Sequence, residues 1–80
     1  MDVLFSKSSL KQLARCESKT RAVIVEAICS LPDRGDIARL KGRIIRNTFR
    51  LRVGRYRVIY TWEGDEIRII EIDTRGDIYK

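Results

Sequence analysis

Phe49-Arg-Leu-Arg-Val-Gly-Arg-Tyr-Arg-Val-Ile-Tyr-Thr-Trp62 alternates apolar and polar residues with a period of two. Successive side chains of a strand point to opposite faces, so this period indicates two half-buried strands. Gly54-Arg55 supplies a tight turn between them. The apolar residues Phe49, Leu51, Val53, Tyr56, Val58, Tyr60 and Trp62 are expected to face a core. The other face then carries Arg50, Arg52 and Arg57 from two adjacent strands.

The rest of the sheet is expected on both sides of this hairpin. Glu63-Gly64-Asp65 indicates a second hairpin turn, and the β-branched run Ile67 to Ile72 indicates a third consecutive strand. Val3-Leu4-Phe5 is an apolar run too short for a helix, and it predicts a first strand near the N-terminus.

Two helices are expected between the first strand and the hairpin. Ser8 or Ser9 can cap the first helix. Apolar residues at helical spacing predict the buried faces, with Leu10, Leu13 and Ala14 in the first helix and Ile24, Ala27, Ile28 and Leu31 in the second. The segment Leu31 to Gly35, with Pro32, ends the second helix. The order is β-α-α-β-β-β, an α+β fold with an antiparallel sheet covered on one face by a helical hairpin, and residues 1–80 form a single domain.

Basic residues are concentrated in one part of the chain. The net charge is +6, and nine basic residues lie between Arg34 and Arg57, where Asp36 is the one acid. Arginine suits phosphate because its planar fork matches two oxygens at once. We therefore expect a polyanion-binding surface at Arg50, Arg52 and Arg57, with no acid among these arginines. The alternative is a solvated basic surface without a ligand.

Composition excludes several kinds of site. The 80 residues include no histidine, so an imidazole acid or base and a histidine-containing zinc site are absent. Cys16 and Cys29 have no CxxC spacing, and both are expected to be small buried side chains rather than ligands or a disulfide. No apolar run is long enough to span a bilayer and the N-terminus does not resemble a signal peptide, so we expect a cytoplasmic protein without cofactor or metal.

Three ordered blocks of the chain are distinctive: Asp36-Ile-Ala-Arg-Leu-Lys-Gly42, Phe49-Arg-Leu-Arg-Val-Gly-Arg-Tyr-Arg-Val-Ile-Tyr60 and Arg75-Gly-Asp-Ile-Tyr-Lys80. Together they resemble the RelE/ParE family of toxins from bacterial and archaeal toxin–antitoxin pairs. The resemblance covers essentially the whole chain. It implies a compact α+β toxin that an antitoxin neutralises by wrapping around it.

The RelE branch of this resemblance implies ribosome-dependent cleavage of mRNA without a metal. Matched by motif, the catalytic residues would be Arg50, Arg52, Arg57, Arg75 and Tyr79. The other basic residues expected to contact RNA are Lys41, Arg43, Arg46 and Arg55. Many relatives carry a histidine or another basic residue just before the position of Arg75, whereas this chain has Asp73 and Thr74. Asp73 is expected to be a turn or ion-pair residue rather than a base.

Two alternatives to the endoribonuclease remain open. The ParE branch implies a protein that binds and blocks DNA gyrase without catalysis, and a degenerate member would bind its antitoxin alone. In each case a cognate acidic antitoxin is the expected partner, because a +6 domain attracts an acidic, partly disordered segment. For the endoribonuclease, mRNA on the ribosome is the second partner.

Overall fold

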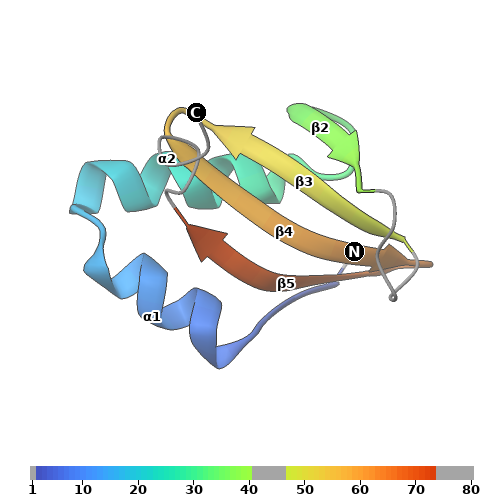
Figure 1. The fold of residues 1–80 in the computed structure, drawn as a ribbon, viewed down its shortest axis with the longest axis horizontal. Helices are drawn as coiled ribbons and strands as arrows, with labels where there is room; N and C mark the ends of the chain where they lie inside the picture. The colour runs from blue at the N-terminus through green and yellow to red at the C-terminus, as the bar shows by residue number, and fades with distance from the viewer. Residues whose placement is uncertain (1, 41–46, 74–80) are drawn as a thin grey trace.

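The computed structural model describes residues 2–40 and 47–73, and it has the expected α+β architecture. Two helices pack against a curved sheet of five strands, and the second helix passes behind the sheet in the view of Figure 1. In chain order the elements are β1 (Asp2–Phe5), α1 (Lys7–Arg15), α2 (Ser18–Cys29), β2 (Asp36–Arg39), β3 (Thr48–Val53), β4 (Tyr56–Glu63) and β5 (Glu66–Asp73).

The sheet order is β1-β5-β4-β3-β2, with β1 parallel to β5 and the other neighbours antiparallel. The first strand, the hairpin and the third consecutive strand are confirmed. The predicted order is wrong in one respect, because it has no strand at β2. This edge strand is only Asp-Ile-Ala-Arg, too short for its alternation to be recognised against the preceding turn.

Helix α1 is fixed to the sheet through Ser6. The Ser6 side chain accepts a hydrogen bond from the Ser9 amide at 3.1 Å and donates one to the carbonyl of Ile70 at 2.6 Å. Ile70 lies at an irregularity in the β4–β5 pairing, where Ile59 pairs with Glu71 and Tyr60 with Ile69. The prediction of Ser8 or Ser9 as the cap is therefore wrong, because α1 begins directly after β1.

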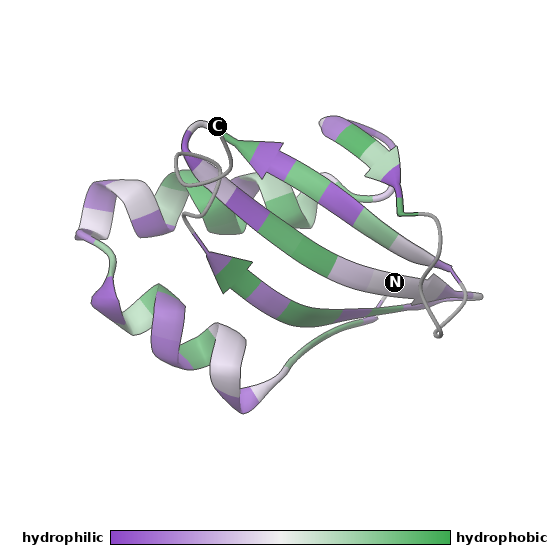
Figure 2. Cartoon of the chain, in the orientation of Figure 1, coloured by the Kyte–Doolittle hydropathy of each residue, from purple (hydrophilic) through white to green (hydrophobic). Residues whose placement is uncertain are grey.

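The helices and the sheet enclose one core. Leu51, Val58, Ile67 and Ile72 are fully buried against apolar side chains of α1 and α2, and β3 alternates hydrophilic and hydrophobic residues as expected (Figure 2). The predicted inner face of α1 is confirmed at Leu13, which is buried, but not at the other two residues. Leu10 is 52% exposed and Ala14 is exposed, because the helix turns Ser9 and Leu13 toward the sheet. Ser9 is fully buried and its hydroxyl donates a hydrogen bond to the carbonyl of Ile69 in β5 at 3.4 Å, so a small polar residue lies between α1 and the sheet.

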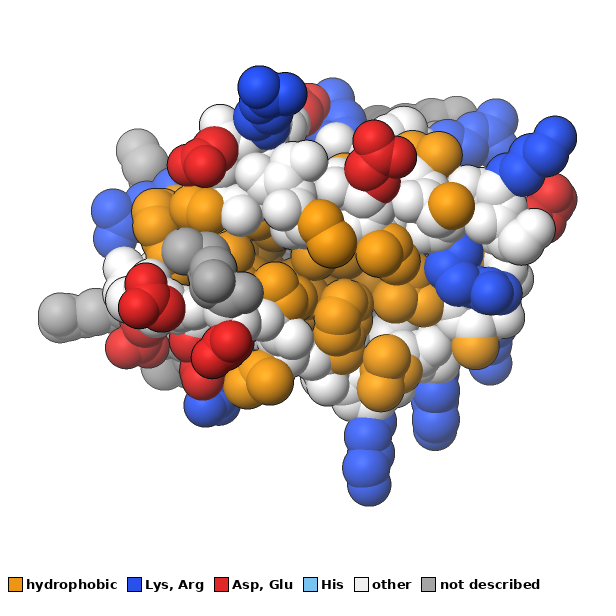
Figure 3. All heavy atoms as spheres, turned by 180° about the vertical axis from the view of Figure 1, so that it is seen from behind, with side chains coloured by type: hydrophobic (Ala, Val, Ile, Leu, Met, Phe, Trp, Pro, Cys, Tyr) orange, Lys and Arg blue, Asp and Glu red, His pale blue; other side chains and the backbone are white. Residues whose placement is uncertain are grey.

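Hydrophobic side chains are also visible on the helix side of the molecule, where they form a band across its middle (Figure 3). Partly buried apolar residues packed against the core include Val3, Phe5, Val25, Phe49 and Trp62. Such a contiguous apolar strip on a small domain is typical of a protein-binding surface. Over residues 2–40 and 47–73, neither helix has the length and hydropathy to cross a membrane.

Gly35 offers a test of the packing between the α2–β2 connection and the core. Its φ is +124°, and a Cβ added there would lie 2.6 Å from Cδ1 of the fully buried Leu51. We expect Gly35→Ala to lower the free energy of unfolding by about 1–3 kcal/mol, measured by urea denaturation. The control is Gly64→Ala, at φ +56° with open space around the new Cβ. Equal losses in the two variants would contradict this packing.

Tyr60 makes stability depend on pH in the alkaline range. Tyr60 is 1% exposed, its ring stacks on Phe49 with centroids 5.5 Å apart, and burial raises the pKa of the phenol above its usual 10.0. Below pH 10 both states keep the proton. As pH rises from there through the higher folded-state pKa, only the unfolded chain loses it, so the free energy of unfolding falls. We expect Tyr60→Phe to lose less stability than wild type on alkaline titration, and parallel curves would contradict this.

Candidate functional site

The sheet face opposite the helices, here called the open face, carries a row of four charged residues across four strands. In register, Asp36 of β2 pairs with Arg52 of β3, Arg52 with Arg57 of β4, and Arg57 with Asp73 of β5. The two arginines are direct cross-strand neighbours, an arrangement that is unfavourable for like charges. The acids at both ends of the row compensate for this repulsion.

Arg50 lies in the next row of the open face, between Ala38 and Ile59. Its side chain is only 19% exposed, and Nη2 is 3.9 Å from Oδ1 of Asp36. Among the described residues, Arg50 Nη1 is buried and has no hydrogen-bond partner. A buried guanidinium N–H without an acceptor is costly, so an anion's oxygen atom that reached it would be favoured.

Acids do lie among the predicted arginines, so that part of the sequence analysis is wrong. The other carboxylate oxygen of Asp36 is 3.9 Å from Nε of Arg52, and Asp73 is 3.6 Å from Nε of Arg57. Asp36 was not placed there because strand β2 was not predicted. The expectation that Asp73 is an ion-pair residue is confirmed, since its side chain is 13% exposed and faces Arg57.

The arginines surround a shallow hollow of about 580 Å³, here called the arginine hollow. Its lining residues are Leu40, Arg50, Arg52, Gly54, Arg55, Tyr56 and Arg57. The β3–β4 turn forms one wall, where Gly54 takes φ +59° and allows the tight reversal. The hollow therefore brings together all three predicted strand arginines and Arg55.

Tyr56 lines the hollow, although the alternation of the hairpin predicts only a core position for it. A hydrogen bond with Cys16, followed by burial, raises the pKa of the Tyr56 phenol. Cys16 is buried at the end of α1, as predicted, whereas Cys29 is exposed and that prediction is wrong. Tyr56 is the first residue of β4 and follows the turn that carries Arg55. This position in the sequence could have indicated that it lies at the edge of the arginine hollow.

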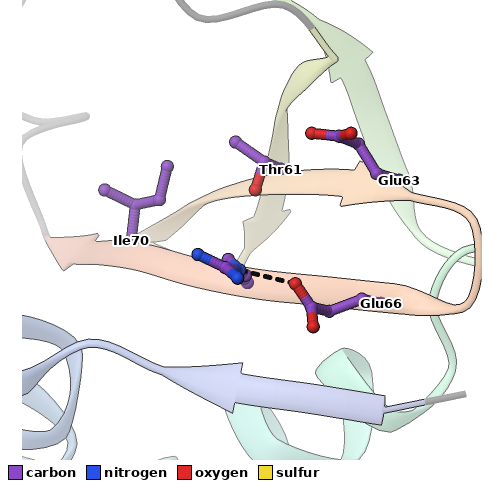
Figure 4. Close-up of a pocket in the computed structure, with 5 residues that line it drawn as sticks. Thr61, Glu63, Glu66 and Ile70 are labelled. Atoms are coloured by element: carbon purple, nitrogen blue, oxygen red, sulfur yellow. Dashed lines mark hydrogen bonds and ion pairs between the residues drawn. The ribbon is translucent and has the colours of Figure 1, made fainter.

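A second hollow on the open face differs in charge. It holds about 530 Å³ and is lined by Thr61, Glu63, Glu66, Arg68 and Ile70 of β4 and β5 (Figure 4). Arg68 donates a 2.5 Å hydrogen bond to Glu66, which raises the pKa of the guanidinium. Because glutamates line this end, the open face is polarised along its strands, with the arginine hollow at the opposite end. This second hollow does not suit an anion.

Five predicted site residues lie outside the described residues. They are Lys41, Arg43, Arg46, Arg75 and Tyr79. Thr74 also lies outside this part of the chain, and the structure therefore places only the strand arginines and Arg55.

A family model and solved structures match this chain. A family model described as the ParE toxin of the type II toxin–antitoxin system parDE matches residues 3–79. A chain of the RelB–RelE antitoxin–toxin complex from Methanococcus jannaschii is 32% identical, with 95% of this chain and 94% of that chain covered and a TM-score of 0.71. A chain of the RelE–RelB complex from Pyrococcus horikoshii is 25% identical, with 94% of each covered and a TM-score of 0.73.

More distant structures share the fold alone. The isolated RelE toxin of Escherichia coli is 16% identical, with 98% of this chain and 89% of that chain covered and a TM-score of 0.74. A search among curated proteins found no significant match. Fold and family match together define a toxin component of a type II toxin–antitoxin system. The chain belongs to the RelE/ParE family of these toxins.

Proposed function

We propose that this toxin is an endoribonuclease that cleaves mRNA on the ribosome and so arrests translation. The observation that carries the proposal is the convergence of Arg50, Arg52 and Arg57 around one hollow on the open face. The 32% identity to a chain of a RelB–RelE complex supports the RelE branch. Because translation takes place in the cytoplasm, this activity would be cytoplasmic.

The proposed reaction needs no metal. The ribose 2′-oxygen attacks the adjacent phosphorus, the P–O5′ bond breaks, and a cyclic phosphate and a 5′-hydroxyl result after the 2′-proton is removed and the leaving oxygen is protonated. Arg57 would stabilise the charge that develops on the phosphoryl oxygens, together with Arg75. Arg50 and Arg52 would hold the RNA backbone. Tyr79 would stack on a base, and the ribosome would align the message.

Asp73 is proposed to orient Arg57 rather than to act as the general base. The carboxylate is largely buried at 3.6 Å from the Arg57 guanidinium, which restrains the side chain that contacts the phosphate. Arginine stays protonated at neutral pH, so the arginines stabilise charge and do not remove the 2′-proton.

The proposed partner is an antitoxin with an acidic and a hydrophobic part. Structures of relatives are of complexes with the antitoxins RelB, YefM and DinJ. On this chain, the apolar band of the helix side offers a surface for hydrophobic side chains, while the arginine hollow suits acidic ones (Figure 3). Neutralisation would then combine apolar docking with charge cover of the hollow and displacement of Tyr79.

Inhibition of DNA gyrase is the second candidate function, because the matching family model is described as the ParE toxin and the ParE branch implies this activity. Primer extension on a translated message after induction separates the two functions, with incorporation of labelled amino acids and thymidine followed in parallel. The endoribonuclease predicts internal cuts and an early stop of translation. Intact message with an early stop of replication would contradict it and favour gyrase. Normal growth would indicate a degenerate member that only binds its antitoxin.

A further inference from the structure

Asp36 is the unexpected member of the site, because it places a carboxylate between two of the arginines. Its two oxygens lie 3.9 Å from Nη2 of Arg50 and 3.9 Å from Nε of Arg52. It therefore lies near both guanidinium groups, where its negative charge competes with that of an approaching phosphate. β2 is an edge strand (Figure 1), and its register with β3 sets Asp36 directly opposite Arg52.

We propose that Asp36 is a displaceable placeholder for the RNA phosphate, a carboxylate that offsets the charges of Arg50 and Arg52 in the free toxin and weakens RNA binding until it is displaced. The inference rests on the proposed function, since it concerns how the same hollow takes its substrate. It assigns Asp36 a role in setting affinity and not a role in proton transfer.

The contacts of the two acids differ in a way that makes Asp36 the displaceable one. The Asp36 side chain is 58% exposed and both of its distances are long, so each ion pair is weak and solvent-screened. The Asp73 side chain is 13% exposed and lies closer to its arginine. Asp73 is therefore fixed beside Arg57, whereas Asp36 can turn into water when an anion approaches.

Arg50 explains why a placeholder is useful. Arg52 and Arg57 repel each other within one row, and Arg50 adds a third positive charge in the next row, where its side chain is mostly buried. In the absence of a ligand, the nearby Asp36 carboxylate offsets part of this repulsion. Its charge lies within a few ångströms of the site that a phosphate would take, so it opposes phosphate binding until it leaves.

The test uses a short fluorescent single-stranded RNA with 2′-O-methyl groups, which binds but is not cleaved. Its affinity for the full-length toxin is measured by anisotropy at a series of salt concentrations. We expect Asp36→Asn to tighten binding by about 3–10-fold at low salt, because a charge that opposes the phosphate has gone. The plot of log affinity against log salt should steepen by about 0.7 for each additional phosphate neutralised.

Matched variants separate this role from a general charge effect. Asp33→Asn makes the same charge change at an exposed residue in the turn before β2, and we expect it to leave affinity and salt slope near those of wild type. Asp36→Glu keeps the charge and should keep the wild-type slope. If Asp36→Asn behaves as Asp33→Asn does, or if Asp36→Glu steepens the slope equally, the placeholder role is wrong.

The variant Arg52→Ala distinguishes two outcomes: a wrong role for Asp36, and a wrong proposed function. When wild type binds the RNA and Arg52→Ala weakens binding, the arginine hollow is the RNA site and the Asp36 variants test the placeholder alone. If Arg52→Ala binds the RNA as tightly as wild type does, or if wild type does not bind it, then the arginine hollow is not the RNA site and the proposed function loses its support. Circular dichroism confirms that each variant is folded before its affinity is compared.

Discussion

Replacing Arg57 with alanine is expected to abolish message cleavage by the induced toxin. Arg57 lies at the centre of the charged row, beside Arg52 and opposite Asp73, and it lines the arginine hollow. Removing one preorganised charge-stabilising group from a phosphoryl or acyl transfer site lowers the rate by about 10²–10³-fold. Primer extension should therefore show loss of the internal cuts, and growth should continue under induction.

Two further variants ensure that the result reports on the site and not on folding. Arg57→Lys keeps a charge beside the largely buried Asp73 but loses the planar fork, so we expect intermediate cleavage with stability near wild type. Arg68→Ala makes the corresponding truncation on the same face at the glutamate-lined end, and cleavage should persist. Full cleavage by a folded Arg57→Ala variant would contradict the assigned role.

Replacing Leu51 with alanine is expected to have the largest effect on stability. Leu51 is fully buried in the middle of β3, between Arg50 and Arg52 in sequence. Its side chain belongs to the hydrophobic core between the sheet and the helices. Truncating such a leucine costs about 2–5 kcal/mol, a large part of the total free energy of unfolding of a small domain. We expect chemical denaturation to show a strongly reduced midpoint and the arginines beside it to lose their alignment.

Leu4→Ala is the matched control for this truncation. Leu4 is 47% exposed on the edge strand β1, so the same change should cost well under half as much. Similar losses from Leu4→Ala and Leu51→Ala would contradict the assignment of the inner face of β3.

The β3–β4 hairpin and its arginine-bearing face could be predicted from sequence. Apolar and polar residues alternate along both strands, so the buried and the exposed face of each strand are fixed. Leu51 and Val58 are both fully buried, and Arg50, Arg52 and Arg57 share the opposite face, as the period of two requires. In this part of the chain, local pattern and tertiary packing agree, so sequence is a sufficient guide.

The parts that could not be predicted depend on contacts between distant segments. The alternation of β2 covers only four residues, so Asp36 was not expected beside Arg50 and Arg52. Likewise, Ser6 caps α1 while it bonds to Ile70, and Ser9 instead of Leu10 faces the sheet. These choices follow from how closely α1 approaches β5, a distance that no helical period specifies.

The positions of acids beside the arginines could not be predicted from the order of charges along the chain. A basic run followed by an acidic one indicates separate patches, yet the sheet register interleaves them. Asp73 from the acidic run pairs with Arg57, and Asp36 from within the basic run pairs with Arg52. The hollow is therefore a set of restrained arginines flanked by acids, and its preference for an anion depends on geometry more than on net charge.

The central claim is that the strand arginines of the open face bind an RNA phosphate. NMR of the side-chain Nε–Hε groups measures this directly during titration with an uncleavable 2′-O-methyl RNA. The account predicts progressive shifts for Arg50, Arg52 and Arg57, with little change at Arg68 on the same sheet. Shifts confined to Arg68 or to arginines of the helix side, with the three strand arginines unchanged at saturation, would contradict it.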